Sequence, residues 1–371
     1  MSKIIEIHII KNYPFANLNR DEAGTPKTAV FGGVNRGRVS SQSLKHAWRK
    51  HFNDAFEFPA ASIRTCRMPG IVRDRLVDDG TETETADVIM ELLSKCFDAG
   101  GKNDDVTRTK QIVPFGVEEI NAIVECAEEI IGSKTADQLR KEYIEGNGLK
   151  NFAKTLGKRT LMSGNAVDIA LFGRMATTNT VSDVEAAMQV AHAISTHRVE
   201  LEEDFFTAVD DIMTDEEKSG APMMGVIEHD SCCYYEYMAL NIDELKENLK
   251  YNENADEIIK KMIPAFIKTA AFCNPSGKST TTGTNELPCA ILVEEKEVPY
   301  NLCNAFVKPV TSEGEGLVFN SVKALADYCE LMNEKYGLPA KRVWFSVPAI
   351  GLSCGDEAKN FGELLDMAGS L

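Results

Sequence analysis

The sequence predicts an α+β fold rather than a doubly wound α/β fold. Residues 4–10 alternate β-branched and polar side chains, as a strand does, whereas residues 117–131 have the apolar spacing of a helix. The other expected strands and helices are separated by long insertions and lack the regular strand–helix–strand spacing of a parallel sheet. With 371 residues, of which 43% are hydrophobic, the chain can bury a large core and divide into two or three parts.

The first 50 residues predict one strand, one long loop and one helix. The strand covers residues 4–10. The loop, residues 11–39, contains four glycines, two prolines and four asparagines, so it is too irregular for a helix and unusually long for a connection. Ser40 or Ser41 is a suitable N-cap for the helix that follows. The inner face of this helix would consist of Leu44, Ala47, Trp48 and His51.

The rest of the chain predicts a helical insertion and then a mixture of strands and helices. The insertion covers residues 82–145 and includes a helical pattern at 86–97. Residues 202–229 are acidic at first and then rich in Gly, Pro and Met, which indicates a protruding hairpin. Further strands are expected at 166–172, 191–201, 232–242, 288–293 and 342–347, and further helices at 256–272, 318–334 and 357–368.

Composition indicates a cytosolic protein without structural disulfides. No run approaches the roughly 20 apolar residues that cross a bilayer, and residues 1–11 lack the features of a signal peptide. None of the ten cysteines forms a C-x-x-C pair, so we expect them to be small core residues rather than disulfides or zinc ligands.

The charge distribution is uneven along the chain. The formal charge is −17 overall, which argues at first against nucleic acid, because phosphate binding depends on Lys and Arg. Residues 1–75 nevertheless hold 13 Lys and Arg against 6 Asp and Glu, a local charge of +7, and the remainder carries −24. Ordinary variation of surface charge explains this pattern as well as a binding surface does, so the motifs must decide.

The motifs that suggest catalysis are incomplete. The segment SGKST at 276–280 would need a glycine at Phe272 to form a phosphate-binding loop, so Lys278 is either a solvated side chain or a single phosphate contact. His192 and His197 lie five residues apart in a predicted strand and would face opposite sides, and the adjacent pair His229–Asp230 occurs often by chance. We therefore expect no catalytic residue, no metal site and no cofactor.

The basic N-terminal segment gives a more consistent signal. Within residues 17–50, cationic side chains, neutral hydrogen-bond donors and the amides at a helix N-terminus occur together, and all three suit phosphates. Gly32 and Gly33 would let the backbone approach a ligand, or would simply form a turn. The candidate contacts are Arg20, Lys27, Arg36, Arg38, Ser40, Ser41, Gln42, Lys45, His46 and Arg49.

The same segment resembles a known family. NLNRD, PKTA-x-FGG and R-x-SSQS-L-K resemble the N-terminal signature of the CasC-type backbone subunits of type I-E CRISPR Cascade complexes, within the RAMP superfamily. The resemblance extends to VDIALFGRMAT, AHAISTHRVE, DFFTAVDDI and YYEYMALNIDELKENL, whereas residues 55–160 and those after about 310 match weakly.

The resemblance implies a right-hand architecture. The family has a palm like an RNA recognition motif with ferredoxin-type topology, a helical finger insertion and a thumb hairpin. The implied boundaries are 1–59, 188–198 and 230–371 for the palm, 60–187 for the finger and 199–229 for the thumb. By the same resemblance, Arg174 and Lys278 join the RNA contacts, and Met175 and Phe206 are apolar wedges that displace guide bases at a regular interval.

The resemblance also implies a non-enzymatic role with several partners. The chain would polymerise along the spacer of a crRNA and grip its backbone, so that base edges remain free to pair with a target DNA strand. The implied partners are further copies of the chain, packed head to tail, and the large, small and repeat-end-binding subunits of Cascade.

Two alternatives compete with this interpretation. Some RAMP relatives are RNA endonucleases, for which Asp21 would be the catalytic carboxylate and His46 or His51 the base. Composition alone also allows an acidic metabolic enzyme of α+β fold, which would not copurify with RNA.

Overall fold

The computed structural model describes residues 3–55, 60–97, 105–176, 180–208 and 223–371, and it shows a mixed α+β protein. These residues form two compact units, each described here by itself. The first unit comprises Met1–His51, Val190–Ala239 and Met262–Leu371; the second comprises Phe52–Gln189 and Leu240–Lys261. No helix in the described ranges combines the length and the apolar character needed to cross a membrane.

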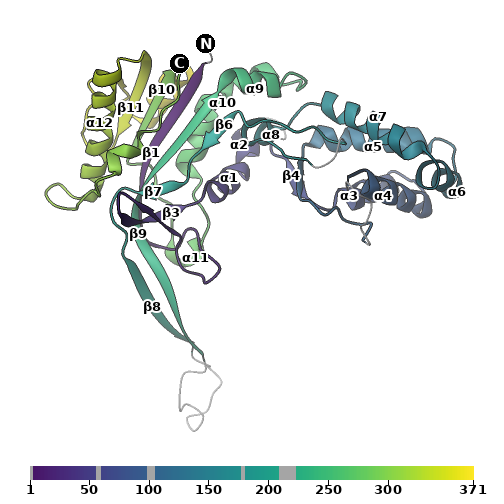
Figure 1. Cartoon of the computed structure of the whole chain (residues 1–371), viewed down its shortest axis with the longest axis horizontal. Coiled ribbons are helices and arrows are strands. Elements are labelled where there is room, and N and C mark those ends of the chain that lie inside the picture. Colours follow the sequence, from purple (N-terminus) through teal and green to yellow (C-terminus); the bar gives the residue numbers. More distant parts are fainter. Residues whose placement is uncertain (1–2, 56–59, 98–104, 177–179, 209–222) are drawn as a thin grey trace, which may run out of the picture. The chain divides into compact units, whose positions relative to one another are not determined.

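The first unit is built on one large sheet (Figure 1). Its strands lie in the order β12 (Asp356–Glu357), β11 (Ala340–Ser346), β10 (Ala290–Lys296), β1 (Ile4–Ala16), β9 (Met223–Asn241), β7 (Ala193–Ser195), β3 (Val34–Val39) and β2 (Thr28–Phe31). β8 (Leu201–Ala208) and β6 (Met188–Val190) also pair with β9. β10 lies between β1 and β11 and is antiparallel to both, and β11 is parallel to β12.

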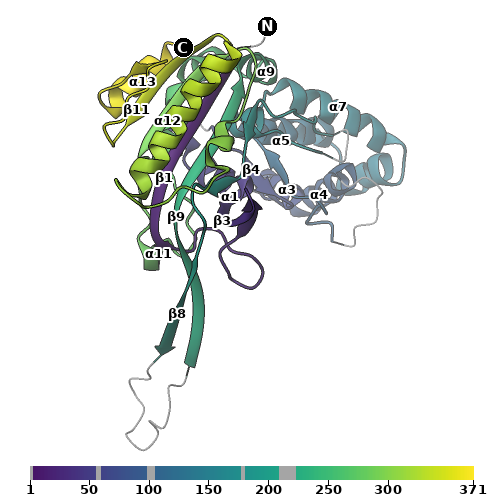
Figure 2. The same cartoon turned by 60° about the vertical axis from the view of Figure 1, so that its left-hand side comes forward.

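One face of this sheet is covered by α12 (Leu317–Tyr336), which runs along the strands in Figure 2. Buried residues of β1, β9 and β10 pack there against α12 and η2 (Leu302–Phe306). α10 (Ala255–Phe272), α1 (Ser41–Arg49), α11 (Ser279–Thr282) and α13 (Phe361–Gly369) complete the helices of this unit, with α10 belonging to it from Met262 on. Trp48 of α1 packs edge-on against Phe266 of α10.

The β8–β9 hairpin extends beyond the sheet in both views (Figures 1 and 2). Its register runs from Leu201↔Asp230 to Ala208↔Met223. Sequence predicted this hairpin, although residues 209–222 lie outside the described ranges.

The second unit is mainly helical, as the sequence predicted for this part of the chain. Its buried core joins residues of α3, α4, α5 and α7 into one apolar cluster. The elements are α2 (Phe52–Ala55), β4 (Ile63–Thr65), α3 (Met68–Asp78), α4 (Thr83–Phe97), β5 (Val113–Phe115), α5 (Val117–Ile131), α6 (Ala136–Leu139), the π-helix η1 (Arg140–Ile144), α7 (Gly148–Met162), α8 (Val167–Phe172) and α9 (Ile242–Asn248).

Several expectations about helices and strands were wrong. Residues 166–172 form helix α8 instead of a strand, because all six residues of α8 are buried and a short apolar run has no periodicity that separates the two structures. Residues 191–201 contain the three-residue β7 and only the first residue of β8, rather than one continuous strand. His51 lies beyond the end of α1 and is exposed, whereas Leu44, Ala47 and Trp48 form the inner face as expected.

The predicted loop at residues 11–39 is mostly sheet. β1 continues to Ala16, and β2 and β3 form a hairpin whose two turn residues, Gly32 and Gly33, both have positive φ. A Cβ at Gly32 would lie 1.9 Å from the carbonyl oxygen of Val307, so only glycine fits there. The hairpin itself therefore accounts for both glycines, and no ligand is needed to explain them.

Candidate nucleic-acid interface

The segment after β1 is held in one conformation by side chains that bond to the backbone. The amide nitrogen of Asn17 donates to the carbonyl oxygens of Gly24 and Glu228, at 3.0 and 2.8 Å. Asp21 accepts from two backbone amides of the turn that follows it. The exposed Arg20 is therefore carried by a fixed backbone, and Asp21 has a structural use as a turn residue.

The N-terminus of α1 is anchored to this segment. The side-chain oxygen of Asn19 accepts from the backbone amide of Ser40 at 2.9 Å, and Ser40 caps the helix by accepting from the amide of Ser43. Lys45 and Arg49 follow on the helix; partial burial, then the charge of Arg49, lowers the pKa of Lys45. The sequence predicted both the cap and the helix because these interactions are local.

The loop at 276–280 lies against the same segment. A Cβ at Gly277 would be 2.3 Å from the carbonyl oxygen of Leu18, so the glycine lets these two segments of the chain approach each other closely. Gly277, Arg20 and Asp21 line one open depression of about 430 Å³. Lys278 comes next, with a left-handed backbone at φ 50°. The structure thus brings Lys278 to the surface that carries Arg20.

Arg38 meets a histidine that sequence reasoning considered only as a metal ligand. Its Nη1 donates to Nδ1 of His192 at 3.0 Å, and its Nε donates to the carbonyl oxygen of Thr28 at 3.2 Å. The backbone amide of Arg38 donates to the carbonyl oxygen of Lys27. This cluster follows from the pairing of β3 with β7, in which Arg38 lies opposite Ile194, and a single sequence carries no signal of that register.

Arg36, two residues earlier on β3, is unsuited to the role predicted for it. Its side chain is fully buried. The guanidinium donates to five backbone carbonyl oxygens, of Phe31, Ser195, Thr196, Phe306 and Val307. Because every donor group is used inside the protein, the prediction that Arg36 contacts phosphate is corrected: it stabilises the junction of β3, β7 and η2.

The remaining predicted contacts of this surface differ in exposure. Arg20, Gln42 and His46 are exposed, whereas Lys27, Arg38, Ser41, Lys45, Arg49 and Lys278 are partly buried. Ser40 is buried and uses its hydroxyl as the helix cap. The cationic part of the candidate interface therefore consists of Arg20, Lys27, Arg38, Lys45, Arg49 and Lys278, and is called the basic surface below.

In the second unit, Arg174 is also buried rather than exposed. Its Nη1 lies 2.8 and 2.9 Å from the two carboxylate oxygens of Glu119 and also donates to the carbonyl oxygen of Pro114, while its Nε donates to the carbonyl oxygen of Ser182. Burial raises the pKa of Glu119, and the charge of Arg174 opposes that increase. The predicted RNA contact at Arg174 is thus corrected to an internal clamp.

The clamp lies next to Met175, whose side chain is 76% exposed. The carbonyl oxygen of Met175 accepts from the side chain of Gln111 at 3.0 Å, and the next amide, of Ala176, donates to Asp183. The backbone is therefore fixed on both sides of an exposed apolar side chain, which is the arrangement that a wedge requires.

Two adjacent phenylalanines of β8 point to opposite faces of the hairpin. Phe205 lies opposite Val226, and both are more than half exposed. Phe206 lies opposite Gly225, and a Cβ on that glycine would be 2.5 Å from the ring. The ring of Phe206 therefore rests on the glycine, partly exposed, and its position depends on the missing side chain.

A row of lysines on α7 was not predicted. Lys150, Lys154 and Lys158 are spaced by four residues, so they share one face of the helix, and all three are exposed. They form no hydrogen bond or ion pair with another residue that the structure describes. The spacing K-x-x-x-K-x-x-x-K was visible in the sequence, in a segment where the family resemblance was weak.

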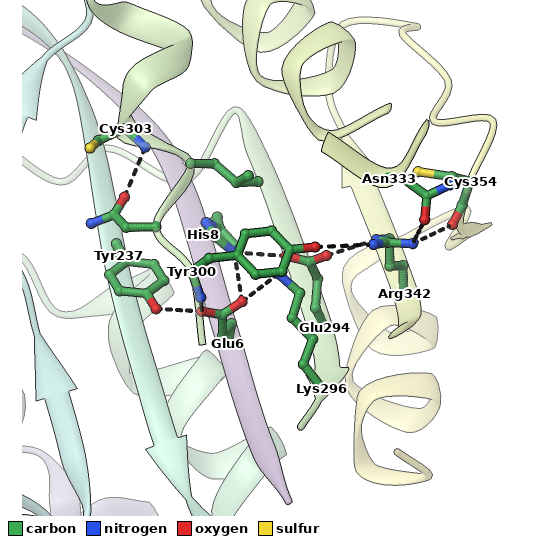
Figure 3. A network of polar contacts seen from close by, with 12 residues as sticks. Glu6, His8, Tyr237, Glu294, Lys296, Tyr300, Cys303, Asn333, Arg342 and Cys354 are labelled. Atoms are coloured by element: carbon green, nitrogen blue, oxygen red, sulfur yellow. Dashed lines mark hydrogen bonds and ion pairs between the residues drawn. The ribbon is translucent and has the colours of Figure 1, made fainter. Parts of the chain in front are cut away.

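A buried network on the sheet contains the arrangement most like a metal site in the described part (Figure 3). Glu6, His8 and Glu294 bring three ligand atoms within 4.8 Å of one another. The ammonium of Lys296 lies 2.5 Å from Glu6 and 2.6 Å from Glu294, and Arg342 donates to Glu294 at 2.7 Å. Burial alone would raise the pKa of Glu294, but His8 and Lys296 outweigh it and lower the pKa to about 2. The protein's own cations thus occupy the position of a metal ion.

The comparison with protein families decides the identity. A family model described as CT1975-like protein matches residues 5–364. The chain belongs to this family. The CT1975-like family is that of the CasC-type subunits of type I-E, which the N-terminal motifs resembled. A search of curated proteins found no match.

Solved structures show the same fold over the whole CT1975-like chain. One similar structure is a chain of a "CRISPR RNA-guided surveillance complex, pre-nicking", with a TM-score of 0.85 and 27% identity over 99% of each chain. Another is a chain of a "CRISPR RNA-guided surveillance complex", with a TM-score of 0.74 and 22% identity over 99% of each chain.

Proposed function

We propose that this CT1975-like protein is a non-catalytic, guide-RNA-binding backbone subunit of a type I-E CRISPR surveillance complex. Its membership in the family and the full-length similarity to a chain of such a complex support the proposal. The observation that carries the RNA-binding role is the basic surface, where six cations gather in a chain whose net charge is −17.

The basic surface suits a backbone contact rather than the reading of bases. Arg and Lys side chains at the end of β1, on β3, on α1 and beside Gly277 offer charged donors to phosphates, and phosphate contacts carry no sequence information. A CRISPR spacer varies, so a subunit that coats it must accept any sequence and leave the base edges free for a target DNA strand.

We assign the thumb and most of the palm to the first unit; the second unit holds the finger together with residues 240–261 of the proposed palm. The proposed finger, residues 60–187, lies within the second unit, and the proposed thumb, 199–229, coincides with the β8–β9 hairpin. Met175 and Phe206 are the proposed wedges. The lysine row of α7 is a second candidate contact to a nucleic-acid backbone, because three like charges on one helix face, without a partner among the described residues, destabilise the helix slightly.

The proposal includes a cytosolic location, no cofactor and head-to-tail packing of copies beside the other Cascade subunits. The endonuclease alternative loses support because Asp21 is engaged by the turn amides that follow it. Coexpression with a guide precursor tests the function: the purified complex should absorb more strongly at 260 than at 280 nm and release intact guide RNA. A complex free of RNA, or one that cleaves labelled RNA when divalent metal is added, would overturn the proposal.

A further inference from the structure

The hydrogen bond between Arg38 and His192 fixes the chemical state of the histidine. A guanidinium has only donors, so Nδ1 of His192 must accept in the 3.0 Å contact. A ring that accepts at Nδ1 is neutral and carries its hydrogen on Nε2. His192 is exposed, and no partner for Nε2 is recorded among the described residues. The free face of the ring therefore offers an N–H donor beside a fixed arginine.

Among the described residues, the charged groups that act on His192 are both cationic. Arg38 faces it from β3, and Lys27 faces it from the segment that precedes β2. Partial burial lowers the pKa of His192, and the charges of Arg38 and Lys27 lower it further. A proton on His192 is thus unfavourable as long as no anion is near, since it would add a third positive charge and put two donors face to face.

We propose that His192 is a further RNA contact, which binds a backbone phosphate together with Arg38 and takes up a proton from solvent as it does so. Protonation places hydrogens on both ring nitrogens, so the Arg38–His192 hydrogen bond breaks and both side chains donate to phosphate oxygens. The phosphate supplies the negative charge that the cluster lacks. This inference rests on the proposed function, because the ligand is the RNA backbone of the basic surface.

Linkage gives the sign of the pH dependence. The phosphate raises the pKa of His192 in the bound state above its value in the free state, so binding takes up a proton. RNA affinity is therefore lowest at a pH above both pKa values of His192, and it rises as the pH falls through them. Each unit of difference between the two values corresponds to about tenfold in affinity.

The test measures RNA affinity against pH for two proteins. The full chain and its His192→Asn variant are titrated into a labelled single-stranded RNA of mixed sequence, at constant ionic strength, from about pH 8 down to about pH 5.5, the range in which histidine titrates. Asparagine can keep an acceptor for Arg38 at the position of Nδ1 but does not titrate. His46, His51 and all carboxylates remain in both proteins, so the difference between the two curves isolates His192.

We expect the wild type to gain more affinity on acidification than the variant, with the two curves converging at high pH. The Cε1 proton resonance of His192 should also titrate at a higher pH when RNA is bound. Parallel curves, or a resonance whose titration RNA leaves unchanged, would overturn the inference and leave the proposed function intact. Absence of RNA binding by the wild type at every pH would overturn both.

Discussion

The basic surface and the β8–β9 hairpin belong to the same unit but differ in chemistry. The basic surface gathers six cations around the end of β1, β3 and α1. The described part of the hairpin, 201–208 and 223–230, contains five Asp and Glu and no Lys or Arg, and it exposes Phe205, Met224 and Val226. The basic surface is suited to hold phosphates, whereas the described part of the hairpin repels them, so we expect residues 201–208 and 223–230 to contribute to RNA binding through apolar contacts and shape.

The largest effect should come from the basic surface. Each charged hydrogen bond contributes about 1.5 kcal/mol or more, so the triple change Lys27→Ala, Lys45→Ala and Arg49→Ala should weaken guide binding by roughly tenfold per residue. The loss should be the same for unrelated spacers. The slope of log affinity against log salt should fall by about 0.7 per contact. A spacer-dependent loss would contradict a contact to the RNA backbone. An unchanged salt slope would assign these residues to folding instead.

Arg174→Ala should act on stability instead of on RNA. Removal of one partner of a buried ion pair costs about 3–5 kcal/mol, because Glu119 keeps an uncompensated charge. Thermal melting without RNA should show the loss. Arg159→Ala is the matched control in the same unit, since its pair with Glu129 is exposed and contributes at most about 1 kcal/mol. If both variants melt like the wild type and only Arg174→Ala loses RNA, the clamp assignment is wrong.

Changes at the two wedge residues should affect RNA rather than the stability of the free subunit. Met175→Ala and Phe206→Ala should leave the free subunit folded but disturb the regular interruption of the guide–target duplex, at about 1–3 kcal/mol per displaced base. Phe205→Ala is the control, because that ring lies on the other face of the hairpin. Truncation of a core Phe costs about 3–5 kcal/mol, so a sharp fall in melting temperature with unchanged base reactivity would identify Phe206 as a core residue.

A smaller effect is expected at Gly225. The Cβ of Gly225→Ala would lie 2.5 Å from the ring of Phe206, so the ring must move. Chemical probing of guide bases should show a partial form of the Phe206→Ala defect. Met224→Ala, whose side chain is exposed beside the glycine, should show none. Equal behaviour of the two variants would mean that the ring position is irrelevant to base displacement.

The two arginines of β3 illustrate what sequence could and could not predict. Arg36 and Arg38 have the same chemistry and lie two residues apart, so composition and motif gave them the same role. Tertiary contacts separate them, because four of the five carbonyls that bind Arg36 lie far along the chain, in or directly after β7 and η2. The Ser40 cap, α1 and α5 were predicted because their signals are local, and the pairing of Arg38 with His192 was missed because it depends on strand register.

The wedge candidates also show that a single sequence does not reveal tertiary contacts. Motif resemblance selected Met175 and Phe206, but only coordinates show the hydrogen bonds that fix the backbone at Met175 and the glycine opposite Phe206. Neither the hydrogen bonds at Met175 nor the glycine opposite Phe206 is marked by a periodic pattern in the sequence. The lysine row of α7 does have such a signal, because its three lysines are spaced by four residues, but it lies in a segment where the family resemblance is weak.

Chemical probing of guide bases in the assembled complex tests the central claim most directly. The chain should be coexpressed with two guides of unrelated spacer sequence, and base reactivity should be recorded along each spacer. A subunit that grips the backbone and displaces bases with fixed wedges predicts reactive bases at one regular interval and at the same positions in both guides. A pattern that follows the spacer sequence, or one without any period, would contradict it.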